Sequence, residues 1–153
     1  MTIKVEPATP EHIEALVGLL EEMDRYYGAD ELDSVEVRTR QVQQALFTEP
    51  RAAFVLLAWQ GDQLVGVASY SFLWPAVGLT RSLYLKELYV SESAQRQGVG
   101  TALMKALFAL AVEHGCSRVE WTTDHDNVRA QQFYEGLGQN ELPTKLFYRV
   151  VTI

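Results

Sequence analysis

The chain has 153 residues, of which 48% are hydrophobic, and a formal net charge of −7. This length and composition favour one compact domain over residues 1–153, because the chain can bury an ample core and no linker or internal repeat divides it. Ten acidic and only two basic side chains lie in residues 1–36. Such an acidic pole repels nucleic-acid phosphates and attracts cations, so we expect no nucleic-acid partner.

Composition also bears on location and on metal binding. No apolar run is long enough to cross a bilayer, and the N-terminus has neither the basic region nor the apolar stretch of a signal peptide. We expect a cytoplasmic protein with no membrane partner. Cys116 is the single cysteine and is expected to be a buried, inert thiol, while the three histidines are scattered, so the sequence predicts no metal site.

The first half of the chain predicts a strand, two helices and a hairpin. Thr9 and Pro10 are typical of a helix start, and Glu11 favours the positive end of that helix. In chain order, the expected elements are a strand over 3–6, a helix from Thr9 to about Gly28, a second helix that opens with a capping box over Asp33-Ser34-Val35-Glu36 and runs towards Thr48, and strands over 52–60 and 64–73.

The second half alternates strands and helices. The expected elements are a loop over 74–78, a strand over 83–90, a helix from Val99 to about Gly115, a strand over 118–123, a helix that carries Phe133 and Tyr134 and ends near Gly138, and a last strand over 146–151. Asn127 is a candidate cap for the last helix. This order predicts an α/β layer fold with a mixed sheet.

The most informative motif lies where the strand over 83–90 leads into a helix. Leu88-Tyr89-Val90 runs through a short polar linker into Gln95-Arg96-Gln97-Gly98-Val99-Gly100-Thr101. Its two glycines let the backbone approach a ligand, and the unpaired N–H groups of the first helical turn carry a partial positive charge. The motif predicts a site for the diphosphate of a phosphorylated cofactor.

Two common nucleotide-binding motifs do not fit this loop. A P-loop needs a lysine before its Ser/Thr, but Gly100 precedes Thr101. The third glycine of a dinucleotide-binding fingerprint is replaced by Ala102 or Leu103. Taken alone, the loop also allows a helix entry whose glycines serve packing only.

A second motif follows after about 30 residues, a distance that fits one helix and one strand. It reads Asn127-Val128-Arg129-Ala130-Gln131-Gln132-Phe133-Tyr134-Glu135-Gly136-Leu137-Gly138. The first motif resembles the acetyl-CoA pyrophosphate motif of the GNAT N-acetyltransferase superfamily, Gln/Arg-x-x-Gly-x-Gly/Ala. The second resembles that superfamily's Asn-x-x-Ala-x-x-Phe-Tyr-x-x-x-Gly motif, and the likeness extends from Ile3 to Val151.

The resemblance implies a GNAT-like fold: a mixed, mostly antiparallel central sheet flanked by helices, with the fourth and fifth strands splayed apart. It implies acetyl-CoA as acetyl donor, with its pantetheine arm between those two strands, and no metal. The residues it assigns to the cofactor are Leu88, Tyr89, Val90, Gln95, Arg96, Gln97, Gly98, Val99, Gly100, Thr101, Asn127, Ala130, Phe133 and Tyr134.

Acetyl transfer to an amine needs an uncharged nitrogen, a stabilised oxyanion and a proton for the departing thiolate. Tyr134 stands seven residues after Asn127, where the family's motif has the tyrosine that protonates the CoA sulfur. We therefore expect Tyr134 to be the general acid of a direct attack in a ternary complex. A backbone N–H between Leu88 and Val90 would meet the oxyanion. Simple aromatic packing beside Phe133 is the alternative interpretation of Tyr134.

The general base is less clearly marked. The strand over 83–90 and the acidic first helix are similar to those of the diamine acetyltransferase branch, which has Leu-Glu-Asp before the phosphate loop. Lys86 stands where that branch has its Glu, and Asp126 where it has a Trp. Because neighbouring strand residues face opposite sides, Glu87 does not simply replace that carboxylate. A water chain to Glu87, or bulk solvent, is left to remove the amine proton.

The acceptor is expected to be the primary amine of a small, cationic molecule. The residues expected to bind it are Glu22, Asp24, Tyr26, Tyr27, Trp74 and Lys86. If Glu22 and Asp24 do so, their neutral amides should raise the acceptor's KM and leave acetyl-CoA binding unchanged.

Two other functions stay open from the sequence: a protein N-terminal or lysine acetyltransferase, and a non-catalytic module that senses acetyl-CoA. By analogy with small acetyltransferases we expect a homodimer that uses the segment 146–153.

Overall fold

The computed structural model describes residues 2–153, which fall into two compact units, one up to Trp121 and one from Thr122 to Ile153. The prediction of a single domain over 1–153 stays a prediction. The elements of the first unit are β1 (Ile3–Pro7), α1 (Ile13–Tyr26), α2 (Val35–Phe47), β2 (Phe54–Gln60), β3 (Gln63–Leu73), β4 (Arg81–Val90), α3 (Val99–Glu113) and β5 (Cys116–Glu120). The second unit contains α4 (Val128–Gly136).

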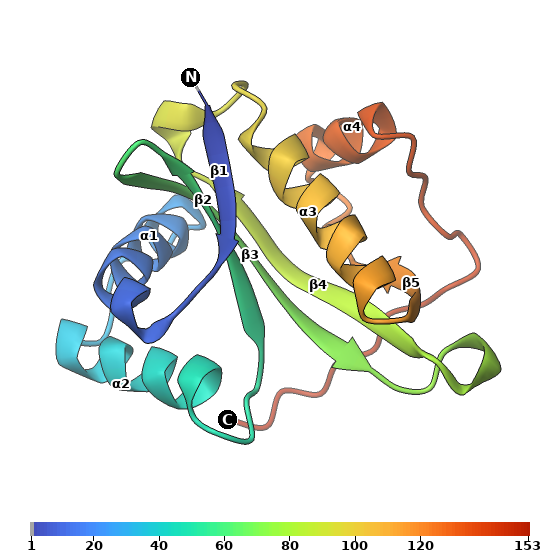
Figure 1. The fold of residues 1–153 in the computed structure, drawn as a ribbon, viewed down its shortest axis with the longest axis horizontal. Helices are drawn as coiled ribbons and strands as arrows, with labels where there is room; N and C mark the ends of the chain where they lie inside the picture. Colours follow the sequence, from blue (N-terminus) through green and yellow to red (C-terminus); the bar gives the residue numbers. More distant parts are fainter. Residues whose placement is uncertain (1) are drawn as a thin grey trace. The chain divides into compact units, whose positions relative to one another are not determined.

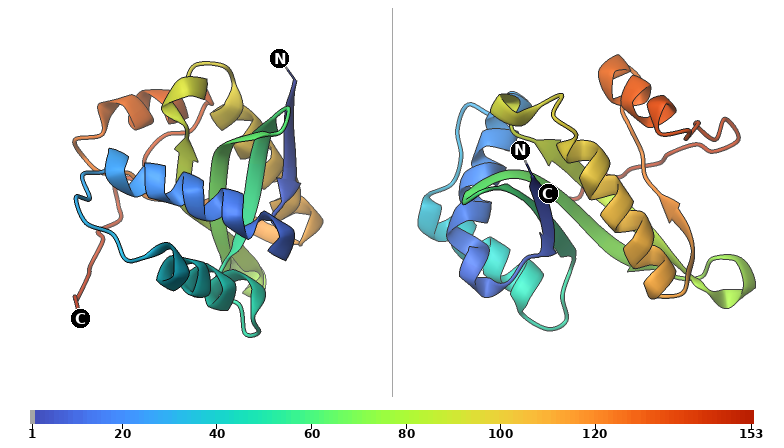
Figure 2. Two further views of the ribbon diagram at one scale, coloured as in Figure 1. Left: turned by 90° about the vertical axis from the view of Figure 1, so that its left-hand side faces the viewer. Right: turned by 45° about the horizontal axis from the view of Figure 1, so that its top comes forward.

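The first unit is built on a five-stranded sheet with the order β1-β2-β3-β4-β5. The first three pairs are antiparallel, and β4 and β5 are parallel. Figures 1 and 2 show α1 and α2 on one face of this sheet and α3 on the other. The predicted α/β fold with a mixed, mostly antiparallel sheet is therefore confirmed.

The predicted separation of the fourth and fifth strands is also confirmed. The ladder between β4 and β5 begins at Arg81 with Cys116 and ends at Tyr84 with Glu120. Within the described chain, residues 85–90 of β4 have no partner in β5, although all of them except Lys86 pair with β3. This half of β4 leads directly to the candidate phosphate loop.

The core beneath α1 and α2 follows from the apolar stripes of these helices. Leu16 and Leu19 of α1 are buried on the same helical face. They pack in one cluster with Leu46 of α2 and with residues of three strands, Val55, Leu57, Val67 and Tyr89. The cluster fixes α1 over the strands that carry the site.

Local capping confirms most of the predicted helix ends. Ser34 caps α2 by accepting a hydrogen bond from the Val37 N–H at 3.3 Å. Gly28 follows α1 with a φ of +99°, a conformation that glycine adopts without strain. The start of α1 differs from the prediction, because residues 10–12 form a 3-10 turn and the α-helix begins only at Ile13.

Three sequence predictions are wrong. Residues 146–151 form no strand, because apolar, β-prone composition is only half of what a strand needs and this segment joins no ladder among the described residues. The strand expected over 118–123 lies over Cys116–Glu120. Cys116 is partly exposed rather than buried.

Among residues 2–153, no helix has the length and apolar character that crossing a bilayer requires.

The close packing of α3 on the sheet depends on a glycine in β3. A Cβ built on Gly66 would lie 2.8 Å from Val99 Cγ1, 3.0 Å from Leu103 Cδ1 and 3.3 Å from Ala58 Cβ. Val99 and Leu103 are fully buried in the first turns of α3. The missing side chain at Gly66 therefore sets how near the N-terminus of α3 comes to the sheet.

We expect Gly66→Ala to lower the free energy of unfolding by about 1–3 kcal/mol, because the added methyl group overpacks this contact. Gly18→Ala is the matched control: its Cβ meets no heavy atom within 4 Å in α1, and alanine favours a helix interior by up to about 1 kcal/mol. Urea unfolding measures both. Equal stability of the two variants would contradict this account of Gly66.

Candidate active site

The backbone between β4 and α3 turns sharply before the helix begins. Ser91 follows β4, residues 92–94 form a 3-10 turn, and the loop then reaches the helix through two residues with left-handed backbone. These are Arg96, with a φ of +63°, and Gly98, with a φ of +84°. The turn places Gly98 at the N-cap of α3.

The N-terminus of α3 fits an anion. Gly98 has no side chain to cap the amides of the first turn, and that turn, Val99 to Ala102, contains no acidic residue. A Cβ built on Gly98 meets no heavy atom of the described chain within 4 Å outside its sequence neighbours, so the space on the side-chain side of Gly98 is open. Unpaired N–H groups and the helix dipole favour a phosphate there.

Hydrogen bonds of glutamine side chains hold the loop between β4 and α3 in place. Gln95 Nε2 donates to the Val90 carbonyl at 3.3 Å, and Gln97 Nε2 donates to the Ser93 carbonyl at 3.3 Å. Gln60 Nε2 at the end of β2 donates to Gln97 Oε1 at 2.8 Å. The side chains of Gln95 and Gln97 therefore fix the loop's shape, and the cofactor role expected of these residues stays a prediction.

The second half of β4 presents the predicted cofactor residues Leu88, Tyr89 and Val90. Leu88 pairs with Ala68, Tyr89 with Val67 and Val90 with Gly66 on the β3 side. The other edge of this segment is not paired by β5 within the described chain. Apart from the Val90 carbonyl, which accepts from Gln95, the backbone groups on this edge could pair with an extended ligand arm or an oxyanion.

A β-bulge changes the direction of the side chains in the middle of β4. Ser69 pairs with Glu87 and Tyr70 pairs with Leu85, so Lys86 is an extra residue in the ladder. Because Ser69 and Tyr70 face opposite sides of β3, Glu87 and Leu85 also face opposite sides, although they are two residues apart.

The bulge places Glu87 on the sheet face that α1 and α2 cover. Its partner Ser69 lies two residues from Val67, which belongs to the core cluster under these helices. Glu87 is half-buried, whereas Lys86 is exposed. Strict alternation of side chains is therefore broken between Leu85 and Glu87, and the role of Glu87 as base stays a prediction.

The end of α1 brings together four of the predicted site residues. The ring centroids of Tyr26 and Tyr27 are 5.3 Å apart, and they lie 5.8 Å and 6.5 Å from the ring of Tyr89. Tyr26 and Tyr27 are exposed, and Tyr89 is buried. Glu22 accepts hydrogen bonds from the Tyr89 hydroxyl at 2.5 Å and from Ser91 Oγ at 3.0 Å.

Asp24 is held by a buried arginine of α2. Its Oδ2 lies 3.3 Å from Arg38 Nη2, and the other end of the guanidinium, Nη1, lies 3.9 Å from Glu21 Oε1. Arg38 is only 9% exposed, which fits its carboxylate partners on α1. Beside this ion pair is an open hollow of about 410 Å³, lined by Asp24, Glu31, Leu32, Asp33, Arg38 and Gln41.

Trp74 lies at the other end of the β3–β4 hairpin. It follows Leu73, which pairs with Ser82 near the start of β4, and it donates from Nε1 to the Leu79 carbonyl at 2.9 Å. Leu73 lies six positions along β3 from Val67, the partner of Tyr89, which corresponds to about 20 Å of strand. The structure therefore does not bring Trp74 to the tyrosines at the end of α1.

The second unit carries the remaining predicted residues on α4. Asn127 is the N-cap, and its Oδ1 accepts a hydrogen bond from the Ala130 N–H at 3.1 Å. Ala130, Phe133 and Tyr134 follow at positions i, i+3 and i+4, so they lie along one side of this helix. The rings of Phe133 and Tyr134 are 5.3 Å apart.

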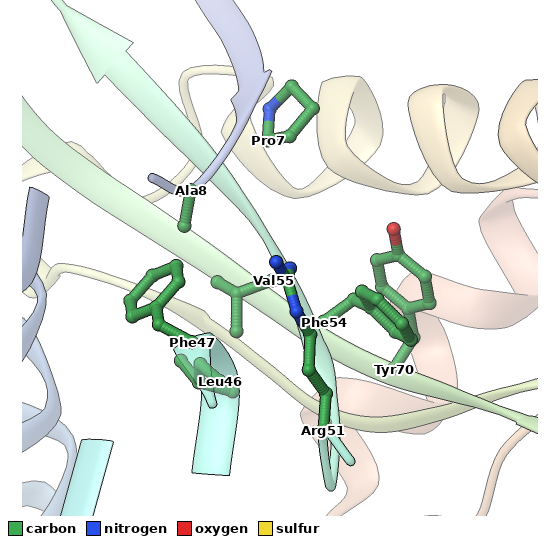
Figure 3. A pocket seen from close by; sticks show the side chains of 8 residues that line it. All are labelled: Pro7, Ala8, Leu46, Phe47, Arg51, Phe54, Val55 and Tyr70. Atoms are coloured by element: carbon green, nitrogen blue, oxygen red, sulfur yellow. The ribbon is translucent and has the colours of Figure 1, made fainter. Parts of the chain in front are cut away.

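A small cavity at the start of β2 is not suited to the cofactor. It measures about 60 Å³ and is lined by Pro7, Ala8, Leu46, Phe47, Arg51, Phe54, Val55 and Tyr70 (Figure 3). Ligand pockets usually measure about 300–1,000 Å³. Among the described residues, no group of three or more His, Cys, Asp or Glu side chains is arranged to hold a metal ion.

Three residues that shape the site were not predicted from the sequence. Gly66 had a signal, because a glycine inside an apolar strand indicates a close backbone approach. Ser91 and Arg38 had none, since a serine after a strand and an arginine in a helix are ordinary surface residues until their partners are known. Both are buried in the structure.

The profile of the Acetyltransferase (GNAT) family matches residues 16–139. The solved structure of an integron cassette protein from the mobile metagenome of V. cholerae is 32% identical, with a TM-score of 0.88, and the match covers 99% of this chain and 94% of that one. The chain therefore belongs to the GNAT family of acetyltransferases, and the family predicted from the two motifs is confirmed.

Curated relatives match a shorter stretch. Thialysine N-epsilon-acetyltransferase of Bos taurus is 31% identical over 83 residues, or 54% of this chain and 48% of the relative. D-amino-acid N-acetyltransferase HPA3 of Saccharomyces cerevisiae is 37% identical over 70 residues, or 46% of this chain and 44% of the relative. The chain thus spans about half the length of the curated relatives it matches.

Tyr89 should make stability depend on alkaline pH. Burial, followed by the hydrogen bond and charge of Glu22, raises the pKa of the Tyr89 hydroxyl above its ordinary value of 10.0. Its contribution is complete below pH 10 and falls at higher pH, because the unfolded tyrosine ionises while the folded one stays protonated. The loss per pH unit is at most about 1.4 kcal/mol.

We expect wild type to lose more unfolding free energy than Tyr89→Phe between pH 9 and pH 11, with the other tyrosines contributing equally to both proteins. Chemical denaturation at the two pH values measures the difference. Identical pH dependence would show that Tyr89 is not protected as described.

Proposed function

We propose that the protein transfers an acetyl group from acetyl-CoA to the primary amine of a small, cationic acceptor, by direct attack of the amine in a ternary complex. The observation that carries this proposal is the open, uncapped N-terminus of α3 at the end of the half-paired strand β4. Membership of the GNAT family supports the same reaction class.

The residues of the chain fit coenzyme A. The amides from Arg96 to Thr101 would bind its diphosphate, because they combine left-handed turns with an uncapped helix start. The edge of Leu88 to Val90 that β5 leaves without a strand partner would bind the extended arm and hold an N–H toward the oxyanion. Bound there, acetyl-CoA supplies the acetyl group as a reactive thioester.

Proton transfer falls to two residues of the chain. The Tyr134 hydroxyl donates its proton to the sulfur of the departing thiolate, a role that its position in the second motif supports. The Glu87 carboxylate accepts the proton of the attacking amine, directly or through water. The bulge at Lys86 supports this role of Glu87, because it places Glu87 on the face of β4 that lies under α1.

The acceptor would bind at the end of α1. Asp24 supplies negative charge, and the exposed rings of Tyr26 and Tyr27 supply faces that attract a cation. Asp24, with Glu31 and Asp33, gives the neighbouring hollow three carboxylates against one guanidinium. The names of the bovine and yeast relatives, which specify thialysine and D-amino acids, support a small amine as substrate. Trp74 and Lys86 stay predicted contacts.

We also propose a cytoplasmic homodimer. The segment 146–153 supports dimer formation, since it is rich in β-branched and aromatic residues but joins no ladder within the described chain. Paired with a second copy, its backbone groups would gain partners.

The reaction is tested by calorimetry with acetyl-CoA and by thiol release with a panel of diamines, polyamines, basic and neutral amino acids, aminoglycosides and a lysine-containing peptide. We expect binding of acetyl-CoA and faster turnover with cationic small amines than with neutral ones. Tight binding with no turnover on the whole panel would favour a sensing module instead. Turnover of the peptide alone would favour a protein acetyltransferase, and an absence of binding would refute the proposal.

Replacing Tyr134 by phenylalanine removes the proposed acid and keeps the ring. We expect kcat to fall by about 10²–10⁴-fold, the usual contribution of a positioned general acid, with little change in the KM for acetyl-CoA. Tyr148→Phe, in the same unit, is the control and should keep its kcat. A kcat for Tyr134→Phe within twofold of wild type would contradict the assignment.

A further inference from the structure

The carboxylate of Glu22 uses both its oxygens within the protein. Oε2 accepts a hydrogen bond from the Tyr89 hydroxyl at 2.5 Å, and Oε1 accepts one from Ser91 Oγ at 3.0 Å. The two donors are two residues apart: Tyr89 is the last residue but one of β4, and Ser91 follows the end of the strand. Glu22 therefore joins α1 to the point where β4 leads into the phosphate loop.

Ser91 is fixed from several directions at this point. It is 6% exposed, and its N–H donates to the Val65 carbonyl of β3 at 2.8 Å. Its carbonyl accepts from the Ala94 N–H at 2.9 Å and so starts the 3-10 turn of the loop. Any shift of Ser91 would pass directly to the residues that follow, up to the N-cap of α3.

Tyr89 is the second anchor of the same carboxylate. Its ring is 3% exposed and packs in the core cluster with Leu16 and Leu19 of α1. Hydrogen bonds from hydroxyl groups to a carboxylate are stronger than those between neutral groups, and burial from water makes them stronger still. Glu22 thus fixes the end of β4 at two points, the buried ring of Tyr89 and the hydroxyl of Ser91.

The neighbouring acid on α1 has different partners. Glu21 lies 3.5 Å from Arg25 of its own helix and 3.9 Å from Arg38 of α2. The same chemical group one position earlier thus pairs with arginines of α1 and α2 rather than with the end of β4.

We propose that Glu22 is a positioning residue for the cofactor loop: by holding Tyr89 and Ser91 it keeps the loop amides in the arrangement that binds the diphosphate of acetyl-CoA. The inference rests on the proposed function. It assigns Glu22 a role different from the acceptor contact expected from the sequence, and the two roles predict changes in different constants.

The test compares Glu22→Ala, Glu22→Gln and the matched control Glu21→Ala with wild type. Calorimetry measures acetyl-CoA affinity, and steady-state kinetics measures the KM of each substrate. We expect Glu22→Ala to weaken acetyl-CoA binding and raise its KM by about tenfold, because both charge-assisted hydrogen bonds at the start of the loop are lost. The acceptor's KM should change less than twofold. Glu22→Gln, which keeps one carbonyl acceptor, should restore part of the affinity, and Glu21→Ala should match wild type.

Two further variants test the same contact without changing a residue of α1. Tyr89→Phe and Ser91→Ala each remove one donor while leaving the carboxylate in place, and each should weaken acetyl-CoA binding less than Glu22→Ala does. Combined with Glu22→Ala, neither should add its full effect, because the shared contact is already lost. Additive losses would overturn the proposal.

The remaining outcomes are also decisive. A raised acceptor KM with unchanged acetyl-CoA affinity in Glu22→Ala would show that Glu22 binds the acceptor, and unchanged constants for both substrates would show that the contact does not position the loop. A wild-type protein that binds no acetyl-CoA would instead refute the proposed function itself, before any variant is compared.

Discussion

The hydrogen bonding of β4 changes halfway along the strand, and the site depends on that change. Up to Tyr84 the strand pairs with a neighbouring strand on both sides, and beyond it β3 is its only strand partner within the described chain. Backbone groups without partners are unfavourable inside a protein, so a strand edge of this kind is stable when solvent or a ligand pairs with it. The same chain then turns into a helix whose first amides are uncapped. One continuous segment thus offers unpaired backbone for an extended arm and for an anion.

The proposed donor site consists mainly of backbone groups. Because local sequence determines the shape of the backbone, the sequence was informative there. The motif predicted a helix start after two glycines, and the structure has Gly98 at the N-cap of α3 with a left-handed backbone that glycine adopts without strain. The cap role of Asn127 was likewise readable, because it depends on residues three positions away. Local sequence is sufficient where the interactions are local.

Contacts between distant segments could not be read in this way. The bulge at Lys86 depends on the register between β3 and β4, and no residue in β4 announces it. The ion pair of Asp24 with Arg38 joins two helices, and the contact of Glu22 with Ser91 joins residues almost seventy positions apart. The acidic pole looked like a free surface for a cation, yet the structure uses part of that charge to fasten its own elements. The last strand failed for a related reason, since composition indicates a preference for extended backbone but not whether a partner is present.

The packing of β3 against α3 has a consequence for how this chain can vary. Gly66 and Val99 share one small volume, because a methyl group on the strand would occupy the space that the valine already fills. The two positions are therefore coupled by size: a larger residue on the strand demands a smaller one on the helix. Sequence changes that respect only the glycine motif after β4 would overlook this requirement, although it lies directly behind the first turn of the helix.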